Sequence, residues 1–353
     1  MRISITFGGA RNSNWEDAAD FVVEAERLGV DDVWSAEAWG YDAVTPLAYL
    51  AAKTSRIRLG TGSMQAGTRT PSLVAMTSQA LDGMSGGRFI LGLGTSGPQV
   101  IEGWHGVPFD KPLKRTRELI DIVRMVTRGM TVAYEGEFHQ LPLPGGEGKA
   151  LRSGAPPIEL PIWLAALGPK NLELCGELCE GWLGGSFIPE TAEVFLQHIR
   201  KGAEKAGRTL DDIELSAGGG VWFTEDVDGA VQQMKRGMAF SLGAMGSRAH
   251  NFYNDAYSRQ GWADEAKRIQ TLWLDGKRDE ARAAVPDEMV LAAQMVGDES
   301  MVRERIQAYR DCGINTLRVD PRGATLQARL DTLGRVVDIV RDLDRQEAAA
   351  AVG

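Results

Sequence analysis

The chain has 353 residues, 43% of them hydrophobic and 25% charged, and its formal net charge at pH 7 is −9. This length predicts one large α/β barrel with insertions or two medium-sized domains, and the acidic balance argues against a nucleic-acid partner. No apolar run approaches the roughly 18 residues of a membrane span, and the first residues lack the apolar stretch of a signal peptide, so we expect a cytoplasmic protein without a membrane partner.

Cysteine and histidine are sparse, with three cysteines and four histidines in the chain. Cys175 and Cys179 stand four residues apart in an apolar helical pattern, which is typical of small buried side chains. No two histidines have the spacing of metal ligands. We therefore expect neither a metal site nor a disulfide framework.

A recurring unit organises the chain: an amphipathic helix, a glycine at its end and a short β-branched strand. Three clear examples end their helices at Gly29, at Gly86 and Gly87, and at Gly313. Glycine can adopt the left-handed conformation that stops a helix and lets the chain turn into a strand. Alternating β and α units predict a parallel sheet.

Eight strands are expected, at residues 3–7, 33–36, 57–62, 89–94, 162–166, 182–185, 213–217 and 316–319. Their residues are apolar on both faces, as in a parallel sheet that helices cover. We therefore predict an α/β fold, a (β/α)8 TIM barrel, as a single domain over residues 1–353. Two stretches, about 130–160 and about 241–298, are too long for simple connections and are interpreted as insertions at the C-terminal face of the strands, the active-site end.

The second strand ends in a segment that contains Glu37 between aromatic residues. A carboxylate at the carboxyl end of a barrel strand is a candidate catalytic group. A buried structural acceptor is an equally good interpretation of Glu37.

The third and fourth strands both end in glycines and small hydroxyl residues. Residues 60–71 leave the third strand through Gly60, Gly62 and Ser63, which suits a flat ring lying against bare backbone. Gly92, Gly94 and Gly97 match the G-x-G-x-x-G spacing of an NAD-binding Rossmann fold. Three β/α units precede this motif and Pro98 follows it directly, so its context favours a barrel rim instead.

Residues 161–171 predict a strand, a tight turn and the start of a helix. The backbone N–H groups of Gly168, Lys170 and Asn171 are expected to point at one spot, where the helix dipole and the Lys170 charge would favour a phosphate. An ordinary capped helix is an equally good interpretation of this segment alone.

Aromatic residues near the expected strand ends are candidate walls of a substrate pocket. These candidates are Trp39, Tyr41, Trp104, Phe187 and Trp222. His105 is a candidate wall and a candidate proton donor in catalysis.

Together these segments resemble the luciferase-like family of flavin and deazaflavin enzymes, and more closely its branch that uses coenzyme F420. The resemblance covers nearly the whole chain. It rests on the order and spacing of residues 33–39, 58–62, 81–88 running into 92–95, and 168–171 leading to 176–177.

The resemblance implies a cofactor, coenzyme F420 or alternatively FMN, and a set of residues that would bind it. A non-proline cis peptide is implied between Gly62 and Ser63. The implied ring and ribityl contacts are Gly62, Ser63, Met64, Thr95, Ser96, Gly97 and Ala166, and the implied phosphate contacts are Gly168, Pro169, Lys170 and Asn171.

The resemblance also implies a reaction: hydride transfer between coenzyme F420 and a small organic substrate. Two alternatives stay open, an FMN-dependent monooxygenase and a non-catalytic flavin-binding protein. Several deazaflavin relatives carry a histidine next to the acidic position, where this chain has Ala38, so their proton-transfer scheme does not carry over. Relatives are often homodimers, although no residue pattern here marks an interface.

Overall fold

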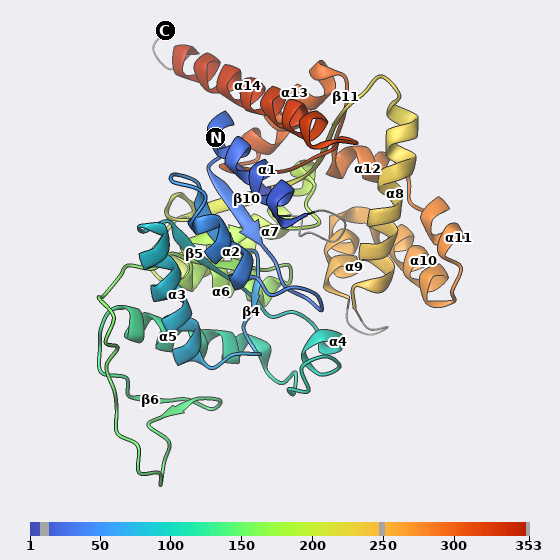
Figure 1. Ribbon diagram of the computed structural model, residues 1–353. Coiled ribbons are helices and arrows are strands. Elements are labelled where there is room, and N and C mark those ends of the chain that lie inside the picture. The colour runs from blue at the N-terminus through green and yellow to red at the C-terminus, as the bar shows by residue number, and fades with distance from the viewer. Residues whose placement is uncertain (8–13, 247–250, 351–353) are drawn as a thin grey trace.

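The computed structural model describes residues 1–7, 14–246 and 251–350. A closed barrel of parallel strands lies at the centre, and helices surround it (Figure 1). The strand order around the barrel is β1, β2, β3, β5, β8, β9, β10 and β12, and pairing of β12 with β1 closes the ring. The predicted (β/α)8 fold is confirmed.

All eight predicted strands are present in the barrel. They are β1 (Arg2–Thr6), β2 (Asp32–Ser35), β3 (Arg58–Thr61), β5 (Phe89–Gly94), β8 (Ile162–Ala165), β9 (Gly181–Leu183), β10 (Glu214–Phe223) and β12 (Thr316–Pro321). The seventh strand, β10, extends beyond the predicted end at residue 217. It does so because β11 (Met295–Gly297) pairs with its last three residues outside the barrel and lengthens the ladder.

The helices that cover the barrel follow the predicted rhythm. They are α1 (Trp15–Leu28), α2 (Val44–Ala51), α3 (Pro71–Ser85), α5 (Pro112–Thr127), α6 (Pro169–Leu178), α7 (Glu193–Lys205), α13 (Glu299–Asp311) and α14 (Leu326–Ala350). Gly29, Gly86 and Gly313 have φ angles of 104°, 70° and 95° at or next to helix ends, as the repeated unit predicts. Each glycine therefore ends its helix in the left-handed region.

Charged and aromatic side chains fill the barrel interior in layers. At the amino-terminal ends of the strands, Arg58 pairs with Asp32 and with Glu214, the latter at 2.8 Å. Above this ion pair, the indoles of Trp34 and Trp163 lie with ring centroids 4.9 Å apart. The interior is thus packed up to the middle of the strands, and open space lies only toward their carboxyl ends.

Glycines in the strands make room for the two indoles. A Cβ at Gly60 would lie 2.1 Å from the Trp34 ring, and one at Gly181 would lie 2.2 Å from the Trp163 ring. A Cβ at Gly92 would lie 1.8 Å from the carbonyl oxygen of Thr61 on the neighbouring strand. Gly92, the first glycine of the G-x-G-x-x-G match, therefore serves the packing of the barrel wall, and the Rossmann alternative fails.

The first insertion contains a short hairpin that folds back along α5. Its strands are β6 (Tyr134–Glu135) and β7 (Gln140–Leu141), and the segment extends away from the barrel (Figure 1). The carboxylate of Glu118 accepts hydrogen bonds from the backbone N–H groups of Glu137, Phe138 and His139. The segment joins the carboxyl end of α5 to the start of β8, and its hairpin reaches back to the first turns of α5, near the carboxyl ends of the strands.

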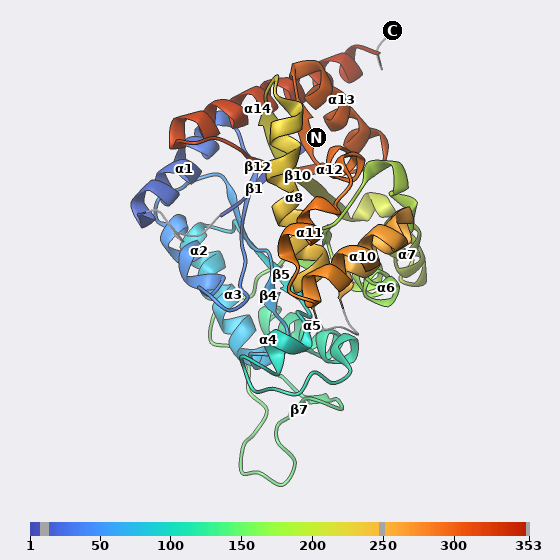
Figure 2. The same ribbon diagram turned by 90° about the vertical axis from the view of Figure 1, so that its right-hand side faces the viewer.

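The second insertion is a helical layer beside the barrel, and it begins at Val227, earlier than the predicted start near residue 241. It consists of α8 (Val227–Ala244), α9 (Phe252–Tyr257), the single turn Ser258–Trp262, α10 (Ala263–Leu274), α11 (Arg278–Ala283) and α12 (Asp287–Ala293). Figure 2 shows α8, α10 and α11 side by side, in yellow to orange. These helices share an apolar core of their own, which includes Met238, Leu242 and Ile269. Residues 247–250 of the predicted insertion lie outside the described part of the chain.

The remaining elements are short. They are β4 (Met64–Gln65), α4 (Pro98–Ile101), and single helical turns at Pro189–Thr191 and Leu210–Asp212. None of the helices in the described ranges combines the length and apolar character needed to cross a bilayer. Across the same ranges, histidine, cysteine and carboxylate side chains form no group of three or more suited to a metal ion.

The packing of Gly92 yields a stability prediction. Gly92→Ala would force its Cβ into the Thr61 carbonyl, so we expect the free energy of unfolding to fall by about 1–3 kcal/mol. Gly83→Ala is the matched control, since its Cβ has open space within α3 and alanine favours a helix by up to about 1 kcal/mol. Urea unfolding of both variants measures the two changes, and a Gly92→Ala variant as stable as the wild type would contradict the packing argument.

Candidate functional site

A cavity of about 620 Å³ opens at the carboxyl ends of the barrel strands. The exits of β3, β5 and β8 converge on it, contributing Ser63, Thr95 and Gly168 among others. Of the residues that the sequence indicated, those that line this cavity are Glu37, Trp39, Gly62, Ser63, Thr95, Ser96, Gly97, Ala166, Gly168, Pro169, Lys170 and Asn171. The segments that follow β3, β5 and β8 therefore line the same cavity.

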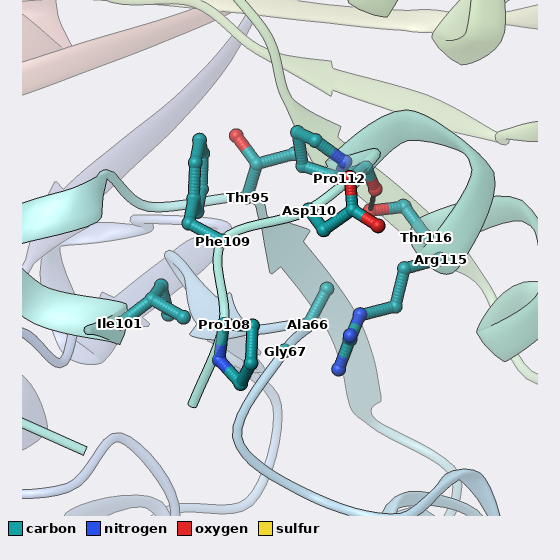
Figure 3. Close-up of a pocket in the computed structure, with 10 residues that line it drawn as sticks. All are labelled: Ala66, Gly67, Thr95, Ile101, Pro108, Phe109, Asp110, Pro112, Arg115 and Thr116. Atoms are coloured by element: carbon teal, nitrogen blue, oxygen red, sulfur yellow. Dashed lines mark hydrogen bonds between the residues drawn. The ribbon is translucent and has the colours of Figure 1, made fainter. Parts of the chain in front are cut away.

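A much smaller cavity adjoins the first and shares Thr95 and Pro112 with it (Figure 3). Its volume is about 10 Å³, close to the smallest space that holds one water molecule. Pro108, Phe109 and Arg115 enclose it on the α5 side. Only the larger cavity has room for an organic ligand.

One side of the larger cavity consists of bare backbone. A Cβ at Gly97 or Gly168 would meet no protein atom within 4 Å, so these residues present backbone directly to open space. Between strand and helix, Ser96 adopts a φ of 56°, a left-handed conformation that non-glycine residues rarely hold outside functional segments. A ligand can therefore approach the backbone of this wall closely.

The chain after β3 bends at a cis peptide bond between Gly62 and Ser63, as the resemblance implied. The Gly62 N–H donates to the carbonyl of Ser35 at 2.7 Å, and the Glu37 N–H donates to the carbonyl of Ser63 at 3.4 Å. The exits of β2 and β3 are therefore tied together at the cavity wall.

Glu37 is a saturated acceptor at the end of β2. Its carboxylate accepts two hydrogen bonds from the Arg69 guanidinium, at 2.5 and 2.9 Å, and one each from the backbone N–H groups of Ala43 and Gln65, at 3.0 and 2.9 Å. The Glu37 side chain is only 6% exposed. A carboxylate with four donors around it is positioned to hold the loops at 43 and 65 in place, which favours the structural interpretation left open above.

The turn before α6 has fewer backbone N–H groups free to bind a ligand than the sequence predicted. The Asn171 N–H donates to the carbonyl of Gly168 at 3.0 Å, because the first turn of the helix closes on itself, so this N–H does not point at a ligand. Gly168 caps α6 without a side-chain hydrogen bond. Arg259 braces the turn by donating to the carbonyl of Leu167 at 2.5 Å. The candidate anion contacts are thus the N–H groups of Gly168 and Lys170.

Three lysines, one from α6 and two from α7, surround the carboxylate of Glu173 in α6. Glu173 lies 2.9 Å from Lys201, 3.4 Å from Lys205 and 3.5 Å from Lys170. The hydrogen bond from Lys201, with help from Lys205 and Lys170, lowers the pKa of Glu173 to about 2. Of these three lysines, Lys170 lines the cavity.

Six predicted residues do not line the cavity, for identifiable reasons. Met64 is fully buried in β4, which pairs with β5. Phe187 packs between the rings of Trp182, Phe195 and Tyr309 in the core.

The other four lie on or near the surface or in the second core. Trp222 packs against the apolar core of the second insertion. Tyr41 is 54% exposed and contacts the ring of Trp15. Trp104 is 64% exposed, and His105 follows it in the exposed loop after α4. An aromatic side chain close to a strand end in sequence thus did not guarantee a place in the pocket.

Sequence reasoning missed several cavity residues. Arg318, in the middle of β12, lines the cavity, as do Gln65 and, from the second insertion, Met245, Phe252 and Tyr253. Arg318 carried a usable signal, since a charged residue inside an apolar barrel strand must point either to an interior partner or to a ligand. The insertion residues carried none, because no sequence pattern says which side of a helical insertion faces a barrel.

The barrel, its packed lower half and the cavity at the carboxyl ends define a TIM-barrel protein with room for an organic ligand. The family model for luciferase-like monooxygenases matches residues 3–316. The chain belongs to the luciferase-like family.

Relatives within this family include F420-dependent proteins. A Mycobacterium tuberculosis protein named as a coenzyme F420-dependent oxidoreductase is 42% identical over 338 residues, covering 93% of this chain and 97% of that protein. The 5,10-methylenetetrahydromethanopterin reductase of Archaeoglobus fulgidus is 28% identical over 319 residues, covering 90% and 93% of the two chains. The structure of the coenzyme F420-dependent tetrahydromethanopterin reductase from Methanopyrus kandleri superposes with a TM-score of 0.79 at 25% identity, covering 94% and 97%.

The contacts of Glu37 predict a structural effect of its replacement. Glu37→Gln removes the ion pair with Arg69 and places an amide among four donors, so we expect the free energy of unfolding to fall by about 1–3 kcal/mol. The control is Glu193→Gln, which breaks an exposed pair with Arg200 and should change stability by less than about 0.5 kcal/mol. Unchanged stability of Glu37→Gln would argue against a structural role.

The lysines around Glu173 predict a pH dependence. The folded protein holds the pKa of this carboxyl at about 2, below the ordinary value of 4.5. Its contribution to stability is therefore complete above pH 4.5 and is lost as the pH falls toward 2. Denaturant unfolding over this range should show a smaller loss in Glu173→Gln than in the wild type, and parallel curves would contradict the assignment.

Proposed function

We propose that this protein is a cytoplasmic F420-dependent oxidoreductase of the luciferase-like class that transfers a hydride between coenzyme F420 and a small organic substrate. The observation that carries the proposal is the convergence of the exits of β3, β5 and β8, rich in glycine and small hydroxyl residues, on one cavity. The names of the relatives support the choice of F420. The whole chain acts as one functional unit, since barrel strands and second insertion both line this cavity.

The residues present fit a deazaflavin with a phosphate on its side chain. Gly62, Ser63, Thr95, Ser96 and Gly97 would hold the ring and ribityl chain against the bare wall. The N–H groups of Gly168 and Lys170, at the positive end of α6, would hold the phosphate. Coenzyme F420, when bound there, supplies two-electron hydride chemistry.

Further contacts would complete the cofactor site. Ala166 and Asn171 line the cavity beside the phosphate turn, and Pro169 sets the first turn of α6. The buried amide oxygen of Gln65 has no hydrogen-bond partner among the described residues, although it lies at the cavity wall, so it offers an acceptor to an N–H group of a bound ring.

The protein residues act mainly by positioning and by excluding water. Glu37 and Arg69 hold the segment after β3 in place, and the packed layer of Trp34 and Trp163 closes the barrel beneath the cavity. A fixed, dry wall lets a ring and a substrate meet at near-contact distance, which is the main requirement of hydride transfer.

Cofactor titration tests the proposal. Adding F420 or FMN to the purified protein and following absorbance and fluorescence should show saturable binding of F420, and the bound reduced cofactor should be oxidised by a small-molecule acceptor. Oxygen uptake with reduced FMN would instead support a monooxygenase. Cofactor binding without turnover on any acceptor would support a flavin-binding protein.

Charge reversal at the phosphate turn gives a sharper prediction. Lys170→Glu places an anion at the start of α6, so we expect the dissociation constant for F420 to rise about threefold to tenfold at low salt. Lys149→Glu, in the exposed part of the first insertion, makes the same change of charge away from the cavity and should leave the constant unchanged. Equal constants for Lys170→Glu and wild type would remove this turn from the cofactor site.

A further inference from the structure

The large cavity has two unlike halves. In the closed barrel, β12 stands directly across from β5, so the bare exits of β3, β5 and β8 occupy one side and β12 the other. Arg318 lines the cavity from β12, and Met245, Phe252 and Tyr253 of the second insertion also line the cavity. If the cofactor lies against the bare wall, this second half is where a substrate would lie.

Arg318 is held in place by backbone carbonyls. Its Nη1 donates to the carbonyl of Gly184 at 2.6 Å, and its Nη2 lies 3.5 Å from the carbonyl of Gly218. A Cβ at Gly218 would lie 1.9 Å from the Arg318 carbonyl oxygen, so glycine allows the two strands to approach. These contacts fix the direction of the guanidinium and leave other N–H donors of the group unused.

The charge of Arg318 has no carboxylate partner. Two arginines beside the barrel strands do have one: Arg58 pairs with Asp32 and Glu214, and Arg69 pairs with Glu37. Arg88, like Arg318, donates to backbone carbonyls, those of Ile57 and Thr54, but it does not line the cavity. Within residues 1–7, 14–246 and 251–350, no carboxylate oxygen lies within 4 Å of the Arg318 guanidinium. Because an arginine stays protonated in proteins, this cation faces the cavity uncompensated.

The groups around Arg318 do not neutralise it. Asp320, two residues further along β12, is 57% exposed and lies 3.2 Å from Arg322. Tyr253 and Tyr309 also face Arg318, and burial raises the pKa of both phenols, which keeps them uncharged. Burial lowers the pKa of Arg318, the direction expected for a cation short of an anion.

We propose that Arg318 binds a carboxylate on the substrate, so that the substrate of the oxidoreductase is a small organic monoacid. This inference rests on the function proposed above. A planar guanidinium that is already held in place can donate two parallel hydrogen bonds to the two oxygens of a carboxylate. Arg318 carries one positive charge, which balances one negative charge on a ligand. The nearby Asp320 carboxylate would repel the second charge of a dianion such as a phosphate monoester.

Binding of simple acids tests the assignment without turnover. We would titrate the wild-type protein, without added cofactor, with benzoate, acetate and the neutral isostere benzamide by calorimetry. The expected result is that benzoate or acetate binds and that Arg318→Gln weakens this binding at least tenfold, while benzamide binds both proteins alike. Arg322→Gln is the matched control, since Arg322 is half-exposed and pairs with Asp320 outside the cavity lining.

Several outcomes would overturn the proposal. Equal affinity of the wild type for benzoate and benzamide, no binding of either acid, or unchanged acid binding by Arg318→Gln would each exclude a carboxylate site at Arg318. Arg318→Lys keeps the positive charge but loses the two parallel N–H donors of the guanidinium, so this variant should bind the acids with intermediate affinity. It replaces Arg318→Gln in the test if Arg318→Gln does not fold. Inorganic phosphate that binds more tightly than either acid and loses this binding in Arg318→Gln would also overturn the proposal.

A parallel F420 titration separates this inference from the proposed function. Arg318→Gln should bind F420 as the wild type does, because the cofactor contacts lie on the opposite strands. A wild type that binds the acids through Arg318 but does not bind F420 would leave the carboxylate site intact and refute the oxidoreductase proposal. Loss of F420 binding in Arg318→Gln with acid binding retained would assign Arg318 to the cofactor and overturn the inference.

Discussion

The contact between the indoles of Trp34 and Trp163 is the constraint on which the rest of this structure depends. Two large rings can share the interior of a barrel only if the strands beside them carry no side chains, and Gly60 and Gly181 meet that need. The rings fill the middle of the barrel above the Arg58 ion pairs. The strand ends are consequently the part of the interior that stays open, and a ligand can enter from one side only.

The open end combines two surfaces with different chemistry. The exits of β3, β5 and β8 present backbone and small hydroxyl groups, which suit a flat ring and its phosphate. Arg318 on β12 lies across the barrel from them, and aromatic residues of the second insertion also line the cavity. Glu37, which its position made a candidate catalytic group, ties the exits of β2 and β3 together through Arg69.

The sequence predicted best where local rules decide the structure. The repeated units ending at Gly29, Gly86 and Gly313 determined the barrel, since each glycine stops a helix by its backbone conformation alone. The cavity-lining glycines and hydroxyl residues were found because strand exits of a barrel share one face. Phe187 and Trp222 were misplaced and Arg318 was missed, because the side of a strand or loop that a residue faces depends on packing between distant segments, which periodicity does not encode.

The second insertion supplies Met245, Phe252 and Tyr253 to the cavity. Most of its buried apolar residues form a core of their own, while Ala256 of α9 packs in the core of the barrel. These three side chains do not belong to the apolar core of the barrel, so changes in them need not disturb the strands. A protein with this division can diversify the molecules it accepts by drift in one peripheral layer, while the part that holds the redox group stays under constant constraint. Exchange of that layer between relatives is therefore a natural route by which one ancestral barrel could give rise to many specificities.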